Sequence, residues 1–269
     1  MRRVKHAIFL IAVTLLFSVC IKAFNKIAYN TLLPRIIVQR INKYFDLNSA
    51  QEAELKAKLK IHHAWHREPQ LKRYVADLSE IKRRFARKLN NKDIDWLLGN
   101  LTLHRNTLFK RVIPDLAGIL QTLEPRQIDH LEKELAEENA ELRKRLKRPL
   151  AERQAEEFAT VLTHVENWAG KLTDEQKQKL KEKYAAIPDS VGDWLEYRID
   201  QQAVFLRLLR SKPSYKQIVA DLEGRMVYQE KNVPKQFKSS FARTAALMRQ
   251  MILGADDLLT AEQRTRVIQ

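Results

Sequence analysis

Apolar residues recur at helical spacing, most clearly in the segment 70–89. There the apolar positions follow one another at steps of three and four, which is the period of an amphipathic helix. They are Leu71, Tyr74, Val75, Leu78, Ile81, Phe85 and Leu89. We expect this stripe to lie in the core of a helical bundle. Only six glycines occur in 269 residues, and strand signals are nearly absent, so the fold class is predicted to be all-α.

Prolines divide the chain into predicted helices, because proline lacks the amide that a helix interior requires. No Gly/Ser linker follows residue 22, so residues 22–269 are predicted to form a single all-helical domain, an elongated antiparallel bundle or array. The expected helices are 30–44, 49–67, 70–89, 92–121, 125–147, 150–170, 174–186, 190–211, 214–230, 235–253 and 261–268.

The first 21 residues have the architecture of a signal peptide or membrane anchor. A basic start, with Arg2, Arg3 and Lys5, precedes the uncharged run 7–21. A spanning helix needs about 20 apolar residues, and Lys22 closes this run early, although a lysine can extend its amine to the interface. The positive-inside rule then directs the rest of the chain to the periplasm. We expect a cell-envelope protein anchored at the inner or outer membrane.

Cys20 is the only cysteine of the chain, which excludes an intrachain disulfide and a cysteine-based zinc site. It closes the apolar run, where a bacterial lipoprotein signal places the cysteine that is lipidated. Ser18 fits such a signal, whereas Phe17 and Val19 depart from it. Cys20 is therefore a lipidation candidate, and an uncleaved anchor or an ordinary cleavage remain alternatives.

A pattern Leu-x-x-x-Gln occurs at four predicted helix starts. Its copies are Leu47–Gln51, Leu123–Gln127, Leu172–Gln176 with Thr173, and Leu259–Gln263 with Thr260. The pattern predicts capping boxes, in which a polar side chain accepts from a backbone amide and the glutamine reaches back to the cap. The copies are separated by 76, 49 and 87 residues, which excludes a regular solenoid.

Histidines cluster at the end of one predicted helix. His62 and His66 are one helical turn apart, as in zinc hydrolases, but the intervening glutamate that such enzymes use is missing. We expect a surface patch of His62, Trp65, His66 and Arg67, and we predict no metal and no cofactor. A metal-binding protein or hydrolase that uses His62 and His66 is the alternative.

The chain is strongly basic, with a formal net charge of +16. Such a charge attracts anionic lipid, lipopolysaccharide, acidic proteins or nucleic acid. Export would remove the chain from nucleic acid, so a basic nucleic-acid-binding protein is a second alternative only. Phosphate-binding loops and nucleophile motifs are absent from the sequence, and we predict that the protein is not an enzyme.

Two resemblances bear on function. Ala28-Tyr29-Asn30, Tyr44-Phe45-Asp46-Leu47, Gln51, Trp65-His66-Arg67, Leu71 and Tyr74 resemble the start of an uncharacterised family of predicted proteobacterial lipoproteins, which implies an all-helical envelope protein. The Leu-Thr-x-x-Gln copies at 172–176 and 259–263 look like those of Spy-type periplasmic chaperones. The resemblances imply a membrane-tethered protein that acts by binding, in envelope maintenance or as a chaperone-like helper of unfolded envelope proteins.

Overall fold

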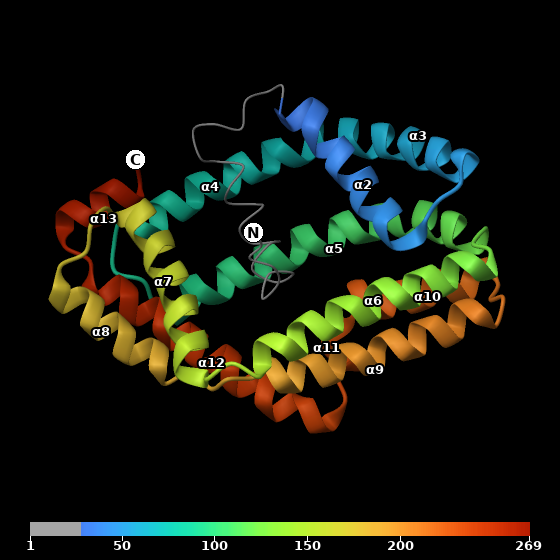
Figure 1. Cartoon of the computed structure of the whole chain (residues 1–269). Coiled ribbons are helices and arrows are strands. Elements are labelled where there is room, and N and C mark those ends of the chain that lie inside the picture. Colours follow the sequence, from blue (N-terminus) through green and yellow to red (C-terminus); the bar gives the residue numbers. More distant parts are fainter. Residues whose placement is uncertain (1–27) are drawn as a thin grey trace. The chain divides into compact units, whose positions relative to one another are not determined.

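The computed structural model describes residues 28–269, and all its regular structure there is helical (Figure 1). The all-α prediction is confirmed. Cys20 and the predicted signal or anchor segment 1–21 lie outside the described residues. Within the described range, no helix combines the length and the hydropathy that crossing a membrane would require.

The helices agree with most of the predicted boundaries. They are α2 (Leu33–Phe45), α3 (Ser49–Trp65), α4 (Leu71–Phe85), α5 (Asn91–Gln121), α6 (Pro125–Leu146), α7 (Leu150–Ala169), α8 (Asp174–Ala185), α9 (Val191–Arg210), α10 (Tyr215–Met226), α11 (Gln229–Asn232), α12 (Lys235–Leu258) and α13 (Ala261–Val267). Two π-helical turns, Ala28–Leu32 and His66–Gln70, precede α2 and α4.

Pro69 was expected to separate two helices, and the helical path instead continues through it. Pro69 lies inside the π turn His66–Gln70, where the amide of Leu71 donates to the carbonyl of His66. This wider turn skips the bond that proline cannot donate, so the chain stays helical across it.

The described residues divide into two compact units. Unit 1 comprises the described part of Met1–Leu71 together with Asn100–Leu135 and Phe205–Gln229, and unit 2 comprises Lys72–Gly99, Ala136–Val204 and Glu230–Gln269. The divisions after Gly99, Leu135 and Val204 fall inside α5, α6 and α9. A division inside helices leaves no linker, so no composition shift marks it in the sequence.

Unit 1 has a continuous apolar core supplied by four helices. Its buried members are Ile113, Ala117 and Leu120 of α5, Ile128 and Leu131 of α6, Leu206 and Leu209 of α9, and Ile218 and Leu222 of α10, with Val227 after α10. A second cluster, Leu47, Leu55 and Ile119, joins α3 to α5 and is extended by Val38 and Ile41 of α2. In this unit α2 and α3 lie side by side (Figure 1).

Unit 2 combines apolar packing with buried ion pairs. α8 packs closely against α12 and α7 (Figure 1). Tyr197 of α9 meets Phe237 and Phe241 of α12 edge-on, at ring-centre distances of 5.5 and 5.7 Å. The buried Arg153 of α7 donates to Asp189 before α9 at 2.5 Å. Such a pair fixes geometry, because either charge left alone in the interior would be costly.

Candidate functional site

The glutamines that end the first two motifs meet inside unit 1. Gln51 lies in the first turn of α3 and Gln127 in the first turn of α6, and their side-chain amides donate to each other at 3.2 Å and 2.8 Å. Each amide also donates to a backbone carbonyl that precedes the partner's helix, Gln51 to Thr122 at 2.9 Å and Gln127 to Asp46 at 3.0 Å. Gln127 has no exposed surface and Gln51 is 5% exposed. The two helix starts are therefore joined through buried amides.

Unit 2 repeats this arrangement with the last two motifs. Gln176 of α8 and Gln263 of α13 donate to each other at 2.8 Å and 3.1 Å. Gln176 also donates to the carbonyl of Leu258 at 2.6 Å, and Gln263 donates to that of Lys171 at 3.0 Å. We call each of these reciprocal pairs, Gln51–Gln127 and Gln176–Gln263, a glutamine bridge.

Both bridges follow one rule. Each glutamine donates to the carbonyl of the residue five positions before its partner glutamine. Its own side-chain oxygen accepts from the backbone amide three residues earlier, at Asn48, Glu124, Thr173 and Thr260. The predicted capping boxes at Asn48, Thr173 and Thr260 are confirmed, and Pro125 is the first residue of α6 as expected.

One capping box of the same chemistry stands outside the bridges. Ser214 and Gln217 form a complete box at the start of α10. It does not match the pattern Leu-x-x-x-Gln, because Pro213 precedes the serine where the other copies have leucine. Gln217 is exposed, whereas each bridge glutamine serves two helices, and Gln51, Gln127 and Gln176 are buried while Gln263 is half-buried. The leucines that open two of the motifs, Leu47 and Leu172, are each 7% exposed.

The histidines of the predicted patch have separate partners within unit 1. His62 Nε2 lies 2.8 Å from a carboxylate oxygen of Asp115, and His66 Nδ1 lies 2.7 Å from the hydroxyl of Tyr29. Burial, and then the neighbouring His63, lower the pKa of His66. Among residues 28–269, no group of three or more His, Cys, Asp and Glu side chains is placed to hold a metal ion.

The other members of that patch differ in exposure. The Arg111 guanidinium carbon lies 5.6 Å from the centre of the half-buried Trp65 ring, a distance within cation–π range. Arg67 is exposed, while His62 and His66 are half-buried. The histidine helix end thus contributes mainly packing and internal hydrogen bonds in unit 1.

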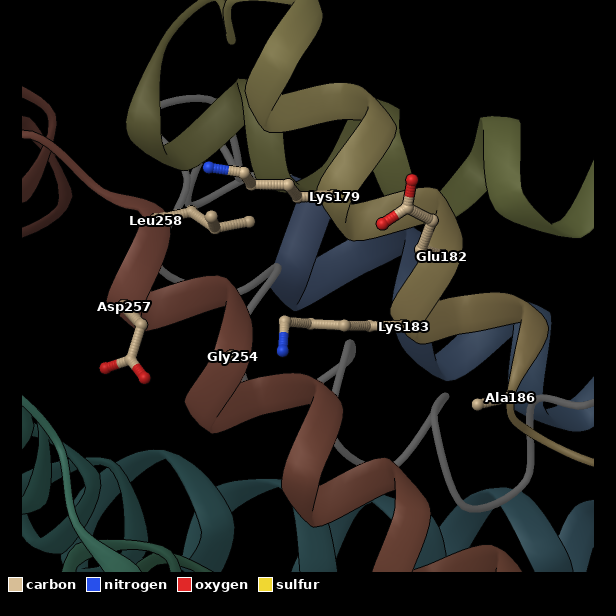
Figure 2. Close-up of a pocket in the computed structure, with 7 residues that line it drawn as sticks. All are labelled: Lys179, Glu182, Lys183, Ala186, Gly254, Asp257 and Leu258. Atoms are coloured by element: carbon tan, nitrogen blue, oxygen red, sulfur yellow. The ribbon is translucent and has the colours of Figure 1, made fainter.

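A pocket of about 560 Å³ opens between α8 and α12 of unit 2 (Figure 2). Its lining residues are Lys179, Glu182, Lys183, Ala186, Gly254, Asp257 and Leu258. Lys183 extends across Gly254, where an added Cβ would lie 2.6 Å from the lysine Cδ and Cε atoms (Figure 2). Two lysines and two carboxylates balance in charge, so the pocket selects neither an anion nor a cation by its net charge.

The apolar stripe of segment 70–89 was expected in a bundle core, and of its members only Leu89, which follows α4, is buried. α4 contains no buried residue, and its Val75 is 63% exposed. Lys72, Arg73, Lys82 and Arg83 are exposed beside the stripe. Such amphipathic helices ordinarily bury their apolar side. α4 therefore offers an unusual combination, a half-exposed apolar stripe between basic side chains.

The carboxyl end of α4 is held by the buried Asp93 at the start of α5. Asp93 accepts from Arg84 at 2.9 Å, from both terminal nitrogens of Arg87 at 2.8 Å, and from the amide of Asn90 at 2.9 Å. The Arg84 guanidinium carbon also lies 4.4 Å from the centre of the Trp96 ring. These contacts join the carboxyl end of α4 to the start of α5.

A second buried carboxylate supports the same connection. Asp256 of α12 is 4% exposed, and it accepts from the amide of Leu89 at 2.8 Å and from Arg264 at 2.6 Å. Arg264 also donates to the carbonyl of Arg87 at 2.9 Å. The segment between α4 and α5 is thus tied to α12 and α13.

We predict that Gln127→Ala lowers the free energy of unfolding by about 2–4 kcal/mol, because it leaves several buried backbone and amide groups without a partner. Gln217→Ala removes an equivalent but exposed cap and should cost less than about 1 kcal/mol. Urea unfolding followed by circular dichroism measures both variants. Equal losses would contradict the bridge as an energetic unit.

Because Gln51 and Gln127 bond to each other, the effects of replacing them on the free energy of unfolding should be coupled. The double variant Gln51→Ala/Gln127→Ala should cost less than the sum of the single variants by about 1 kcal/mol or more, since both singles break the same contacts. Gln217→Ala combined with Gln127→Ala should be additive within about 0.5 kcal/mol.

The contacts of Asp93 should make the stability of the fold depend on pH. The hydrogen bond from Arg87 lowers its pKa most, burial opposes this, and bonds from the Asn90 amide and Arg84 add to the lowering, giving a pKa of about 2. An unfolded aspartate has a pKa of about 3.9, so the ionised form stabilises the fold above that pH, and this stability is lost as the pH falls toward 2.

The comparison of wild type with Asp93→Asn measures this effect. The wild type should be more stable at pH 7, and the difference should shrink progressively between about pH 4 and pH 2. Asp95→Asn, which removes an acid that is 63% exposed and paired with Arg249, is the control and should change stability by less than about 1 kcal/mol. A difference in stability that is constant from pH 7 to pH 2 would contradict a lowered pKa of Asp93.

Comparison with known proteins places the chain in one family. The model of DUF6279, described as a family of unknown function, matches residues 43–237. The matched range includes the motifs at 47–51, 123–127 and 172–176, while the motif at 259–263 follows it. No curated protein and no solved structure matches the chain. Because the match covers most of the sequence, the chain belongs to DUF6279, an uncharacterised family whose fold in this member is entirely helical over the described residues.

Proposed function

We propose that this chain is a membrane-tethered periplasmic protein that binds exposed segments of other envelope proteins, as a chaperone-like helper, and catalyses no reaction. The observation that carries the proposal is α4. Within α4 the apolar stripe has no buried member: Val75 is exposed and the other members are half-buried, although an amphipathic helix gains stability by covering such a stripe. A polypeptide segment with exposed apolar side chains would cover it.

The charges beside the stripe define the kind of segment. Lys72, Arg73, Lys82 and Arg83 are exposed, and Glu80 is paired with Arg83 and Arg84. An unfolded segment that carries acidic residues among apolar ones would contact both parts of this surface. Long-range attraction would raise its association rate, and the apolar contacts would retain it.

The attachment of α4 supports the same role. The Asp93 contacts hold one end of the helix in place, so the binding surface is preorganised and little order has to be created on binding. The resemblance of the motifs at 172–176 and 259–263 to those of Spy-type chaperones agrees with this proposal.

We expect wild-type protein to bind reduced and carboxymethylated α-lactalbumin, a soluble and acidic unfolded chain, in a fluorescence-anisotropy titration. Val75→Glu should weaken the Kd about tenfold, because the apolar contact of an exposed valine is lost and an acid repels the client. Leu103→Glu is the matched control, since Leu103 is 59% exposed in unit 1, and its Kd should equal that of wild type. Equal weakening by both variants, or no binding by wild type, would sink the proposal for α4.

The tether has its own test. The intact mass of protein from the membrane fraction is measured for wild type and Cys20→Ala. A lipoprotein predicts that the wild type lacks residues 1–19 and carries acyl chains, and that the variant does neither. An unmodified full-length mass in both would instead indicate an uncleaved anchor. Full-length or cleaved protein found only in the soluble fraction would contradict a tether of either kind.

A further inference from the structure

The outward side of α2 is basic and apolar. Exposed residues recur along it at helical spacing, and the opposite side packs on α3 through Val38, Ile41 and Phe45. The exposed residues are Leu32, just before the helix, and Arg35, Ile36, Gln39, Arg40 and Lys43. We call this set the α2 outer face. It contains two large aliphatic residues, Leu32 at 50% and Ile36 at 57% exposure, and no acid.

The absence of acids extends well beyond α2. Asp46 is the first acidic residue of the sequence, so residues 1–45 carry positive charge only. Between the uncharged run 7–21 and Asp46 lie Lys22, Lys26, Arg35, Arg40 and Lys43. Arg40 and Lys43 also contact the Tyr44 ring, at 5.5 and 5.3 Å, and both remain exposed.

Chain length limits how far α2 can be from that run. Leu32 is eleven positions after Ile21, and an extended chain spans at most about 3.6 Å per position, which gives about 40 Å. If the run 7–21 is in a membrane, the amino-terminal end of α2 stays close to the membrane surface. The exposed aliphatic residues lie at this same end of the helix.

We propose that the α2 outer face lies on an anionic phospholipid bilayer. Leu32 and Ile36 enter the boundary between headgroups and acyl chains, and Arg35 and Arg40 contact lipid phosphates, as expected of an interfacial helix with basic and apolar residues on one side. This inference rests on the tether of the proposed function and is independent of client binding by α4.

Charge complementarity favours lipid over a protein partner for this face. Arg35 and Arg40 lie beside the aliphatic pair Leu32 and Ile36, which suits a flat surface of many phosphates. Lys43, at the other end of α2, is paired with Glu134 of α6 at 2.9 Å. A helix that docks in a protein groove would instead present aliphatic anchors over several turns. On α2 those anchors face α3.

Depth measurements by electron paramagnetic resonance test this placement. The full chain carrying Cys20→Ala, which keeps the run 7–21, is spin-labelled at Ile36→Cys and reconstituted into nanodiscs of phosphatidylcholine alone or with phosphatidylglycerol. Collisions of the label with oxygen, which partitions into lipid, are compared with collisions with a water-soluble nickel chelate. Leu103→Cys is the matched control, being a leucine of similar exposure in the same unit.

The expected result is a shift toward oxygen at residue 36 in the phosphatidylglycerol nanodiscs, with no shift at residue 103. Adding Arg35→Glu and Gln39→Glu, two exposed positions of the same face, should abolish the shift. A label at residue 36 that stays water-accessible in both nanodiscs overturns this inference while the tether stands. A shift that is independent of the anionic lipid also overturns it, and a chain that does not copurify with nanodiscs overturns the tether together with the inference.

Discussion

A buried amide must find partners for its two hydrogens and its oxygen, and in this protein that requirement fixes where helices begin. Gln127 has no exposed surface, so each of its groups would be costly if left unpaired. Its oxygen accepts at the start of its own helix and its nitrogen donates to Gln51 and to the chain before α3. One side chain therefore sets the positions of two helix starts, and the apolar cluster of Leu47, Leu55 and Ile119 forms around the joined ends.

The local part of this device could be predicted from the sequence, and the long-range part could not. A cap and its glutamine are three residues apart, so the boxes at Asn48, Thr173 and Thr260 follow from local geometry. The pairing of Gln51 with Gln127 depends on how helices 76 residues apart pack, and no spacing encodes it. The box of Ser214 and Gln217 has the same three-residue spacing of cap and glutamine. A pattern that also requires a leucine before the cap does not include it, because Pro213 stands there.

Periodicity predicted the existence of α4 but not its surroundings. Steps of three and four report that one side of a helix is apolar, whereas burial depends on which element covers that side. The buried acids Asp93 and Asp256 were also missed, because acids are rarely buried without partners. The spacing of Asn90 and Asp93, which places a cap at the start of α5, was the available signal.

The glutamine bridges also bear on the order in which the chain folds. Each glutamine can close its own capping box across three residues, which is a local contact with a small loop-closure cost. The bond between the two glutamines closes 76 residues in unit 1 and 87 in unit 2, and contacts of such long range form slowly. The capping box therefore orients the glutamine amide toward its distant partner before the two helices meet. The same side chain first stabilises a helix start and later fixes how that helix packs against the other.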